Sequence, residues 1–287
     1  MRHDSSGTLV GFRTHENEHN CGERGGGVRQ QMGARRAIAF AFAVAALALL
    51  AGGSAVIAQA ATPTASYRQA VLDASPASYW RLGETGGTSA ADETGRNPGT
   101  YNNVLLGAPG ALSSDSDPSA SFDGVRSYVR MPASPSLDMT SAVTVEFWAK
   151  RRTISNTYQV LVGKPGDGQS KKENYAVWLT TSNKYQAYFG DGSTFVSVVT
   201  PAITDTNWHY VVATYNGSRA RIYLDGVLKQ EIPQTLQMAT NNLPLNIGRA
   251  NANQYFFNGW LDEVAIYPTA LPAQTILAHY NRATGSP

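Results

Sequence analysis

The segment from Trp208 to Gly226 constrains the fold more than any other part of this 287-residue chain. It holds two runs of alternating apolar and polar residues, and each is followed by a turn pair, Asn216-Gly217 and Asp225-Gly226. Such pairs are strong hairpin signals, because the central residues of a tight hairpin turn take positive φ. Every second residue from Ala220 to Leu224 is apolar, so one face of this strand packs in a core and the other meets solvent or a ligand. The segment therefore predicts an antiparallel sheet with one buried face.

Together with the hairpin segment, short apolar runs along the chain predict thirteen strands, separated by turns rich in Gly, Asn and Asp. They are approximately 79–84, 120–122, 128–131, 144–150, 159–163, 175–180, 185–189, 194–199, 208–215, 220–224, 227–231, 245–248 and 259–267. Short helices are expected over 67–72, capped by Ser66, and over 272–282, with Ile276, Leu277 and Tyr280 buried. Without an internal repeat or a second core, the expected fold class is all-β. It is an antiparallel two-sheet β-sandwich of the jelly-roll type, with short capping helices.

The first sixty residues predict a leader and a secretory signal. Residues 1–34 are polar and Gly-rich, which is typical of disorder, and Met32 is the expected true start. Residues 35–60 join two arginines to an apolar stretch and an Ala-Gln-Ala cleavage site. An uncleaved membrane anchor is the alternative, since the apolar stretch could nearly span a bilayer. A linker over 61–66, a domain over 67–282 and a tail over 283–287 follow, with an extracellular or cell-surface location.

Charge and cysteine content exclude several classes of function. Of 23 basic and 21 acidic residues, six and four precede residue 61, so the mature part has seventeen of each and no net charge. A neutral domain lacks the basic stripe of a nucleic-acid-binding protein, and membrane attachment is expected only with an uncleaved signal. The single cysteine, Cys21, lies in the leader. The domain therefore has no disulfide, no cysteine nucleophile and no cysteine-ligated zinc.

Several short motifs occur along the chain in a characteristic order. They are Tyr79-Trp80-Arg81-Leu82-Gly83-Glu84, Asp92-x-Thr94-Gly95-Arg96-Asn97, Phe122-Asp123-Gly124, Val145-Glu146-Phe147-Trp148, Trp208-His209-Tyr210-Val211, Tyr223-Leu224-Asp225-Gly226 and Gly259-x-Leu261-Asp262-Glu263-Val264. On this ordered set the chain resembles the laminin-G-like, concanavalin A-like lectin/glucanase jelly-roll family over about 67–282. The resemblance implies a secreted or cell-surface module, usually non-catalytic, that binds glycans or proteins, in some relatives through calcium. Fold alone does not fix which of these applies.

The chain is not expected to be an enzyme. Glycoside hydrolases on this fold place carboxylates at alternate positions of one strand, where both can reach the cleft. No strand has such a run, since the residues two and four after Glu146 are Trp and Lys. Asp115 and Asp117 have the right spacing but lie in a Ser/Pro-rich loop. His209 and His279 are expected to pack and hydrogen-bond, so a glycoside hydrolase is the least favoured alternative.

One loop offers the oxygen ligands that calcium takes from carboxylates, amides and backbone carbonyls. It contains Asp92 and Asn97 among several glycines. In the family that the chain resembles, this loop and the strand carrying Asp262 can lie close together. The predicted metal ligands are therefore Asp92, Asn97 and Asp262, with Ca²⁺ as the candidate cofactor. The alternative is that Asp92 and Asn97 are turn residues that bond their own backbone.

Tyrosine and tryptophan are abundant after the leader, and exposed aromatic rings are surfaces on which sugars stack. Trp80, Phe147 and Trp260 are expected in the core, whereas Tyr185 and Tyr188 have opposite parity, so one of them faces outward. The predicted ligand-binding residues are Trp178, Tyr185, Tyr188, Asn251 and Tyr255. Loop 163–170, together with 251–254, is the expected rim of the binding site, and loops 92–99, 163–174 and 251–256 are where function is expected. The predicted function is a secreted, non-catalytic binding module for extracellular glycan, or alternatively a protein-interaction or adhesion module at the cell surface.

Overall fold

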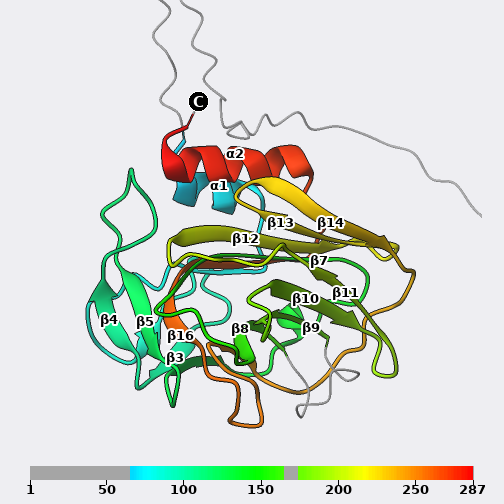
Figure 1. The fold of residues 1–287 in the computed structure, drawn as a ribbon, viewed down its shortest axis with the longest axis horizontal. Coiled ribbons are helices and arrows are strands. Elements are labelled where there is room, and N and C mark those ends of the chain that lie inside the picture. Colours follow the sequence, from blue (N-terminus) through cyan, green and yellow to red (C-terminus); the bar gives the residue numbers. More distant parts are fainter. Residues whose placement is uncertain (1–64, 165–173, 287) are drawn as a thin grey trace, which may run out of the picture. The chain divides into compact units, whose positions relative to one another are not determined.

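The computed structural model describes residues 65–164 and 174–286, which form two stacked antiparallel sheets (Figure 1). In spatial order, sheet A contains β14 (Val227–Pro233), β13 (Arg219–Leu224), β12 (Trp208–Tyr215), β7 (Val143–Arg151), β16 (Asn258–Tyr267), β5 (Ser119–Asp123) and β4 (Leu105–Ala108), and β1 (Ser78–Trp80) pairs with β16. Sheet B contains β11 (Phe195–Val199), β10 (Tyr185–Gly190), β9 (Tyr175–Leu179), β8 (Gln159–Gly163), β15 (Leu245–Ile247), β6 (Tyr128–Met131), β3 (Gly99–Asn102) and β2 (Ser89–Ala90). The predicted two-sheet sandwich is confirmed. The predicted leader and signal, and most of loop 163–174, lie outside the described residues.

Two helices, α1 (Tyr67–Asp73) and α2 (Ala273–Thr284), lie side by side on the outer face of sheet A (Figure 1). Ser66 caps α1 as expected, because its hydroxyl accepts a hydrogen bond from the backbone of Gln69 at 3.2 Å. In α2, Ile276 is buried as predicted, but the prediction for Leu277 is wrong, since its side chain is 44% exposed. Both ends of the described chain therefore lie on the sheet A side of the sandwich. A short 3₁₀ helix, η1 (Pro135–Leu137), precedes β7.

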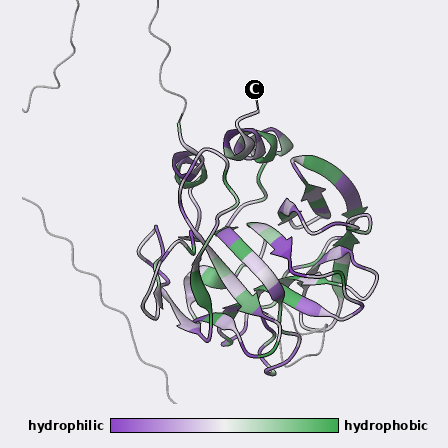
Figure 2. Ribbon diagram, turned by 60° about the vertical axis from the view of Figure 1, so that its left-hand side comes forward, coloured by the Kyte–Doolittle hydropathy of each residue, from purple (hydrophilic) through white to green (hydrophobic). Residues whose placement is uncertain are grey.

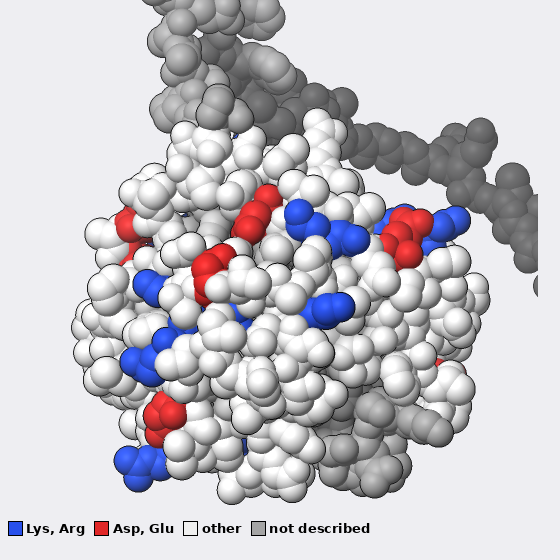
Figure 3. Space-filling view, viewed as in Figure 1, with Lys and Arg blue, Asp and Glu red and all other residues white. Residues whose placement is uncertain are grey.

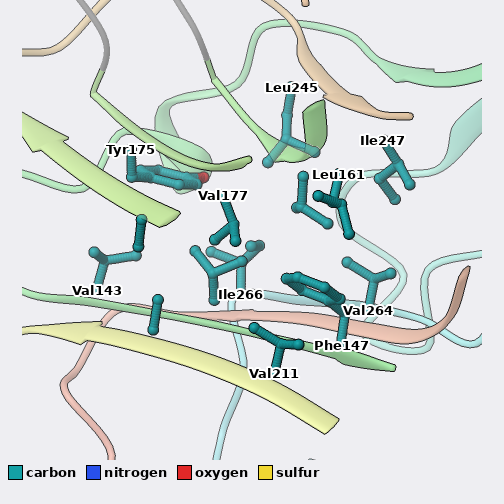
Figure 4. Close-up of a cluster of buried hydrophobic side chains, with 14 of the residues drawn as sticks. Val143, Phe147, Leu161, Tyr175, Val177, Val211, Leu245, Ile247, Val264 and Ile266 are labelled. Atoms are coloured by element: carbon teal, nitrogen blue, oxygen red, sulfur yellow. The ribbon is translucent and has the colours of Figure 1, made fainter. Parts of the chain in front are cut away.

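The main core fills the space between the sheets, where apolar side chains from both inner faces point toward one another (Figure 4). Sheet A contributes Phe147, Val211 and Ile266, and sheet B contributes Val177 and Ile247. Hydrophobic and polar residues alternate along several strands (Figure 2), as expected when one face of a sheet is buried. A second apolar cluster lies between the outer face of sheet A and the helices, so this sheet is covered on both sides.

The hairpin segment forms β12 and β13 as the sequence predicts. Asp225 and Gly226 take φ of 54° and 77°, and Ala220, Ile222 and Leu224 face the core. The opposite face differs from the expectation, because Tyr223 is buried in the cluster beneath the helices. This part of the strand therefore packs against the helix layer. The segment Trp208–Gly226, which predicts the fold most clearly, has a structural role.

The core predictions are right for Trp80 and Phe147, which are fully buried, and wrong for Trp260. Leu261 occupies the core-facing position, so Trp260 points to the outer face of sheet A and stays partly exposed. Lys150 Nζ and Arg152 Cζ lie 5.6 and 4.2 Å from its ring centroid. Such cation–π contacts suit an aromatic ring at a surface.

Three short strands, β2, β3 and β4, form where the sequence predicted mainly a loop. They have two to four residues each, too few for the alternation of residues to reveal them. Among the described residues, no helix has the length and apolar character needed to cross a membrane. Figure 3 shows acidic and basic side chains scattered among uncharged residues on one face of the molecule.

Candidate functional site

A continuous row of five aromatic rings crosses the outer face of sheet B. It runs from Phe195 on β11 through Tyr188 on β10 and Trp178 on β9 to Tyr255 and Tyr158. Successive ring centroids are 5.2, 6.3, 5.2 and 6.4 Å apart. We call these five side chains the aromatic row. No helix of the described chain covers it, because both α-helices lie against sheet A.

Strand register explains how these residues come together. Tyr188 pairs with Ala176 on β9 and with Ser197 on β11, so Trp178 and Phe195 lie on the same face and two residues away along the neighbouring strands. Tyr255 comes from the loop between β15 and β16 and takes a φ of 56°. Its backbone carbonyl accepts a hydrogen bond from Val160 of β8 at 2.8 Å, which fixes the loop against the sheet.

The row is accessible at one end and anchored in its middle. Tyr158 and Tyr255 are 46% and 38% exposed, whereas Trp178 is 8% exposed and packs on Val160 and Ala250. The Trp178 indole Nε1 donates to no atom among the described residues. A shallow pocket of about 500 Å³ lies at the exposed end, lined by both tyrosines and by Asn156, Thr157, Thr181, Phe256 and Gly124. This end of the row offers apolar faces beside hydroxyl and amide groups.

Neighbouring rings are steeply inclined to one another. The interplanar angles are 65° between Tyr188 and Phe195, 80° between Trp178 and Tyr188, and 58° between Trp178 and Tyr255. The row is therefore not a flat platform.

The structure brings four of the five predicted ligand-binding residues to this region. Trp178, Tyr188 and Tyr255 are members of the row, and Asn251 lies on the same loop as Tyr255, where its Oδ1 accepts from Asn246 Nδ2 at 2.6 Å. The prediction for Tyr185 is wrong. This side chain is fully buried between the sheets, because Tyr185 shares the inward face of β10 with Ala187 and Phe189.

Sequence reasoning missed Phe195 as a member of the row. It is the first residue of β11, the edge strand of sheet B, where alternation has not yet begun. The available signal was parity with Ser197, a polar residue two positions later, which marks the outward face.

The predicted calcium loop is a closed turn. Both carboxylate oxygens of Asp92 accept hydrogen bonds, including those from the backbone amides of Tyr79, Thr94 and Asn97 at 2.8–2.9 Å. The Asn97 amide donates to Ser78 and Ser136. Asp92 and Asn97 thus take the alternative role of turn residues.

Asp262, the third predicted metal ligand, lies in a different acidic cluster. Its carboxylate groups with those of Asp117 and Glu263, with one ligand atom of each residue within 4.8 Å of the others. A register shift in β16 between Asp262 and Ala265, with Glu263 at a φ of 54°, places both carboxylates on the same bulge. Neither Asp92 nor Asn97 is in this cluster, which corrects the predicted ligand set.

Negative charge in this cluster is only partly neutralised. Glu263 accepts hydrogen bonds from the hydroxyl of Tyr79 and from Arg81, whose Nη2 also contacts Asp115 at 2.7 Å. Burial raises the pKa of Glu263 to about 7 despite Arg81, and burial followed by the charge of Glu263 raises the pKa of Asp262 well above its usual value. Asp262 Oδ2 accepts from the Ala111 amide at 2.8 Å, but its buried Oδ1 has no donor among the described residues.

This donor set fits a hard divalent cation such as calcium, which prefers carboxylate oxygens. Asp262 Oδ1 is the first atom that could bind it, since it is buried and accepts no hydrogen bond from a described residue. Asp117 Oδ2 is the second, although it also lies 3.4 Å from Arg81 Nη2. Both oxygens of Glu263 are engaged by Arg81 and Tyr79, so this residue would contribute charge rather than a free ligand.

Glu146 forms a second buried polar cluster, beneath the helices. Its carboxylate accepts hydrogen bonds from the hydroxyls of Tyr67 at 2.9 Å and of Tyr210 and Tyr267 at 2.7 Å, and it lies 3.1 Å from His279 Nδ1. Burial alone would raise the pKa of Glu146, but His279 and the hydroxyl donors outweigh it and lower that pKa. All these groups are buried, and the cluster joins both helices to sheet A.

Comparison with known proteins agrees with this architecture. A family model described as the concanavalin A-like lectin/glucanases superfamily matches residues 123–277, and the chain belongs to this superfamily. No curated protein matches the chain in sequence.

Several solved structures share the fold. Domain 4 of AbnA, a GH43 extracellular arabinanase from Geobacillus stearothermophilus solved in complex with arabinotriose, is similar with a TM-score of 0.52 and 17% identity, over 71% of this chain and 98% of that one. The binding domain of botulinum neurotoxin serotype D is similar with a TM-score of 0.58 and 13% identity, over 73% of this chain and 52% of that one. A structure of botulinum neurotoxin type C, whose description names interaction with two ganglioside molecules, has a TM-score of 0.54 and 12% identity, over 71% and 52%.

The chain thus spans about half the length of the neurotoxin structures that it matches. At these identities the likeness shows the fold alone. Within that fold, the neighbours are mostly binding domains of larger proteins, which is consistent with a binding module.

Proposed function

We propose that this chain is a secreted, non-catalytic carbohydrate-binding module and that the aromatic row on sheet B is the surface on which sugar rings stack. The observation that carries the proposal is the row itself, five rings in successive contact on a sheet face that no helix of residues 65–164 and 174–286 covers. Aromatic faces with nearby hydroxyl and amide groups are the usual composition of a site for an amphipathic ligand such as a pyranose. The neighbours described with arabinotriose and with gangliosides support carbohydrate as the class of partner.

The two clusters of buried carboxylates support a non-catalytic role. Glu146 is enclosed between a sheet and two helices, and Glu263 is held by Arg81 and Tyr79. Neither is placed on the face that carries the aromatic row, since both lie on strands of sheet A. A glycoside hydrolase needs two carboxylates flanking the same bond of a bound sugar.

The test is a screen of purified protein against soluble polysaccharides and a glycan array, followed by affinity measurement on the best ligand. Tyr255→Ala and Tyr158→Ala remove exposed rings of the row, and each is expected to weaken binding at least tenfold, about 1.4 kcal/mol. Trp260→Ala is the matched control, because it removes a partly exposed ring from the opposite sheet. It should leave affinity unchanged.

Three outcomes would contradict the proposal. If Trp260→Ala weakens binding as much as Tyr255→Ala, the row is not the site. If no glycan binds and a surface protein is captured through the same residues, the chain is an adhesion module instead. Release of reducing ends from any polysaccharide would contradict the non-catalytic role.

We propose calcium as a structural ion held by Asp117 and Asp262. The support is Asp262 Oδ1, which is buried beside a second carboxylate and accepts no hydrogen bond from a described residue. A cation there would neutralise the negative charge of the cluster that Arg81 does not compensate. Calcium is then expected to raise the melting temperature of the EDTA-treated protein, and Asp262→Asn should remove that increase. A melting temperature that is the same in calcium and in EDTA would contradict this assignment.

A further inference from the structure

The outer face of sheet B has a second part, next to the aromatic row, that carries positive charge. Arg130 lies on β6 and is exposed, and Arg249 follows β15. The guanidinium Cζ of Arg249 lies 3.4 Å from the ring centroid of Tyr128, which is two residues before Arg130 and on the same face of β6. Arg249 Nη1 donates to Asn253 Oδ1 at 2.7 Å. Arg249 is therefore held in place, with its charge beside that of Arg130.

Neither arginine has a carboxylate partner among the described residues. None of the eight strands of sheet B contains Asp or Glu, and the segment 248–257 contains none either. Asp191 lies in the turn between β10 and β11, where its oxygens accept hydrogen bonds from Ser193 and Thr194 of the same turn. Burial, with a further contribution from Arg130, lowers the pKa of Arg249, as expected for adjacent cations without an anion.

Sheet A shows the opposite arrangement. Its strands carry five acidic residues, Asp123, Glu146, Glu231, Asp262 and Glu263. Its exposed arginines on β13 are paired, since Arg219 and Arg221 both contact Glu231 at 2.5 Å. Arg151 and Arg152, at the end of β7, donate only to neutral oxygens, so arginines without a carboxylate also occur on sheet A. What distinguishes the outer face of sheet B is that its strands carry no acidic residue and that it also carries the aromatic row.

The loop between β15 and β16 joins the two parts. Ala250 packs against Trp178 and Val160, and it directly follows Arg249 in the chain. Five residues further on, Tyr255 enters the aromatic row. One short loop therefore sets a stacking surface and a pair of guanidinium groups side by side.

We infer that this face binds an anionic glycan, with a sugar ring stacked on the aromatic row and the acidic group of the same or a neighbouring sugar bound by Arg130 and Arg249. The inference rests on the proposed function and names its ligand class. Guanidinium groups bind carboxylate and sulfate oxygens through paired, charge-assisted hydrogen bonds. The ring of Tyr128 already shields one side of the Arg249 guanidinium from water, so less water has to be removed when an anion binds.

The experiment compares matched acidic and neutral ligands by calorimetry or biolayer interferometry on the purified full chain. The pairs are oligogalacturonate with its methyl ester, sialyllactose with lactose, and 3′-sulfolactose with lactose. The first two pairs test a carboxylate and the third tests a sulfate. At least one acidic ligand is expected to bind ten times more tightly than its partner, and the preference should shrink as NaCl rises.

Arg130→Gln and Arg249→Gln should each remove most of this preference and leave the affinity for the neutral partner within about twofold. Arg126→Gln is the charge-matched control, since Arg126 is 73% exposed, pairs with Asp123 and lies outside the strands of sheet B. It should leave the preference intact. The melting temperature of each variant confirms that it is folded.

Two failures can be told apart. If acidic and neutral partners bind equally and Tyr255→Ala weakens both, the inference is wrong and the carbohydrate-binding function stands. If no member of any pair binds and neutral polysaccharides fail as well, both are wrong. A preference that persists in Arg130→Gln and Arg249→Gln would also overturn the inference.

Discussion

The pair formed by Glu146 and His279 should dominate the stability of the helix layer, and His279→Phe is the substitution that tests it. The pair joins β7 to α2, and Tyr67 of α1 donates to the same carboxylate. Phenylalanine keeps a planar ring, slightly larger than the imidazole, but removes the charge and the donor. The carboxylate then remains buried with hydroxyl donors as its only partners.

The magnitude follows from this geometry. Removing one partner of a buried ion pair costs about 3–5 kcal/mol. Three tyrosine hydroxyls still donate to Glu146 in the variant and partly compensate its buried charge. We therefore expect the free energy of unfolding to fall by about 3 kcal/mol, at the lower end of this range. For a domain of this size, each kcal/mol shifts the melting temperature by about 2–4 °C, which gives a decrease of roughly 6–12 °C.

The pH dependence adds a second readout. Burial would lower the pKa of His279, but Glu146 outweighs it and raises that pKa above 6.5, so its contribution to stability is complete below that pH and is lost as pH rises through the raised value. The pKa of Glu146 is lowered from 4.5, so its contribution is complete above that pH and is lost as pH falls through the lowered value. Stability from the pair is therefore greatest between about pH 4.5 and 6.5. In His279→Phe, the free energy of unfolding should therefore fall less steeply as pH rises above 6.5.

The assay is urea-induced unfolding followed by tryptophan fluorescence, at several pH values. His209→Phe is the matched control, because the carboxylates that His209 contacts, Asp205 and Asp225, are 45% and 32% exposed. Water can solvate these carboxylates in the variant, so its loss should be about 1 kcal/mol or less. Equal losses in both variants, or an unchanged pH profile in His279→Phe, would refute the assigned role of the buried pair.

Three further predictions concern packing and charge. Gly110→Ala should lower the free energy of unfolding by about 1–3 kcal/mol, because the new Cβ would lie 2.1 Å from the backbone oxygen of Asp117. Gly86→Ala is the control, since its Cβ would have no atom within 4 Å, and it should be neutral or slightly stabilising in the same urea titration. Phe147→Ala should cost about 3–5 kcal/mol, since this ring is fully buried between the sheets, and a loss below 1 kcal/mol would contradict its place in the core. Asp262→Asn should raise the melting temperature in EDTA at neutral pH, as it removes one of several crowded buried carboxylates, and a decrease measured by scanning fluorimetry would contradict that reasoning.

The sequence predicted the sandwich because most of its strands are long enough for alternation to appear. Tyr188 and Tyr185 show the limit of that reasoning. Parity established that one of them faces outward, but only the pairing of β10 with its neighbours shows that Tyr188 is the outward one. Trp260 illustrates the same limit, since the sequence did not show which of the adjacent apolar residues Trp260 and Leu261 faces the core, and in the structure it is Leu261.

The polar clusters were harder to predict, because they depend on contacts between distant segments. Asp117 looked like a loop residue, and nothing local indicates that it meets Asp262, which is 145 positions away. Glu146 and His279 are likewise separated by 133 positions. Arg130 and Arg249 come together through the pairing of β6 with β15, and their lack of acidic neighbours is visible only once the strands of sheet B are known.

The helix layer also decides how this module can be attached to something else. The helices α1 and α2, next to the two ends of the described chain, lie on the sheet A side of the sandwich, and the strands β9, β10 and β11 of sheet B lie on the other side (Figure 1). These three strands carry most of the aromatic row. The first and last described residues therefore lie on the side opposite the row. An immobilising surface or partner domain joined directly before Ala65 or after Ser286 would hold the proposed binding face outward.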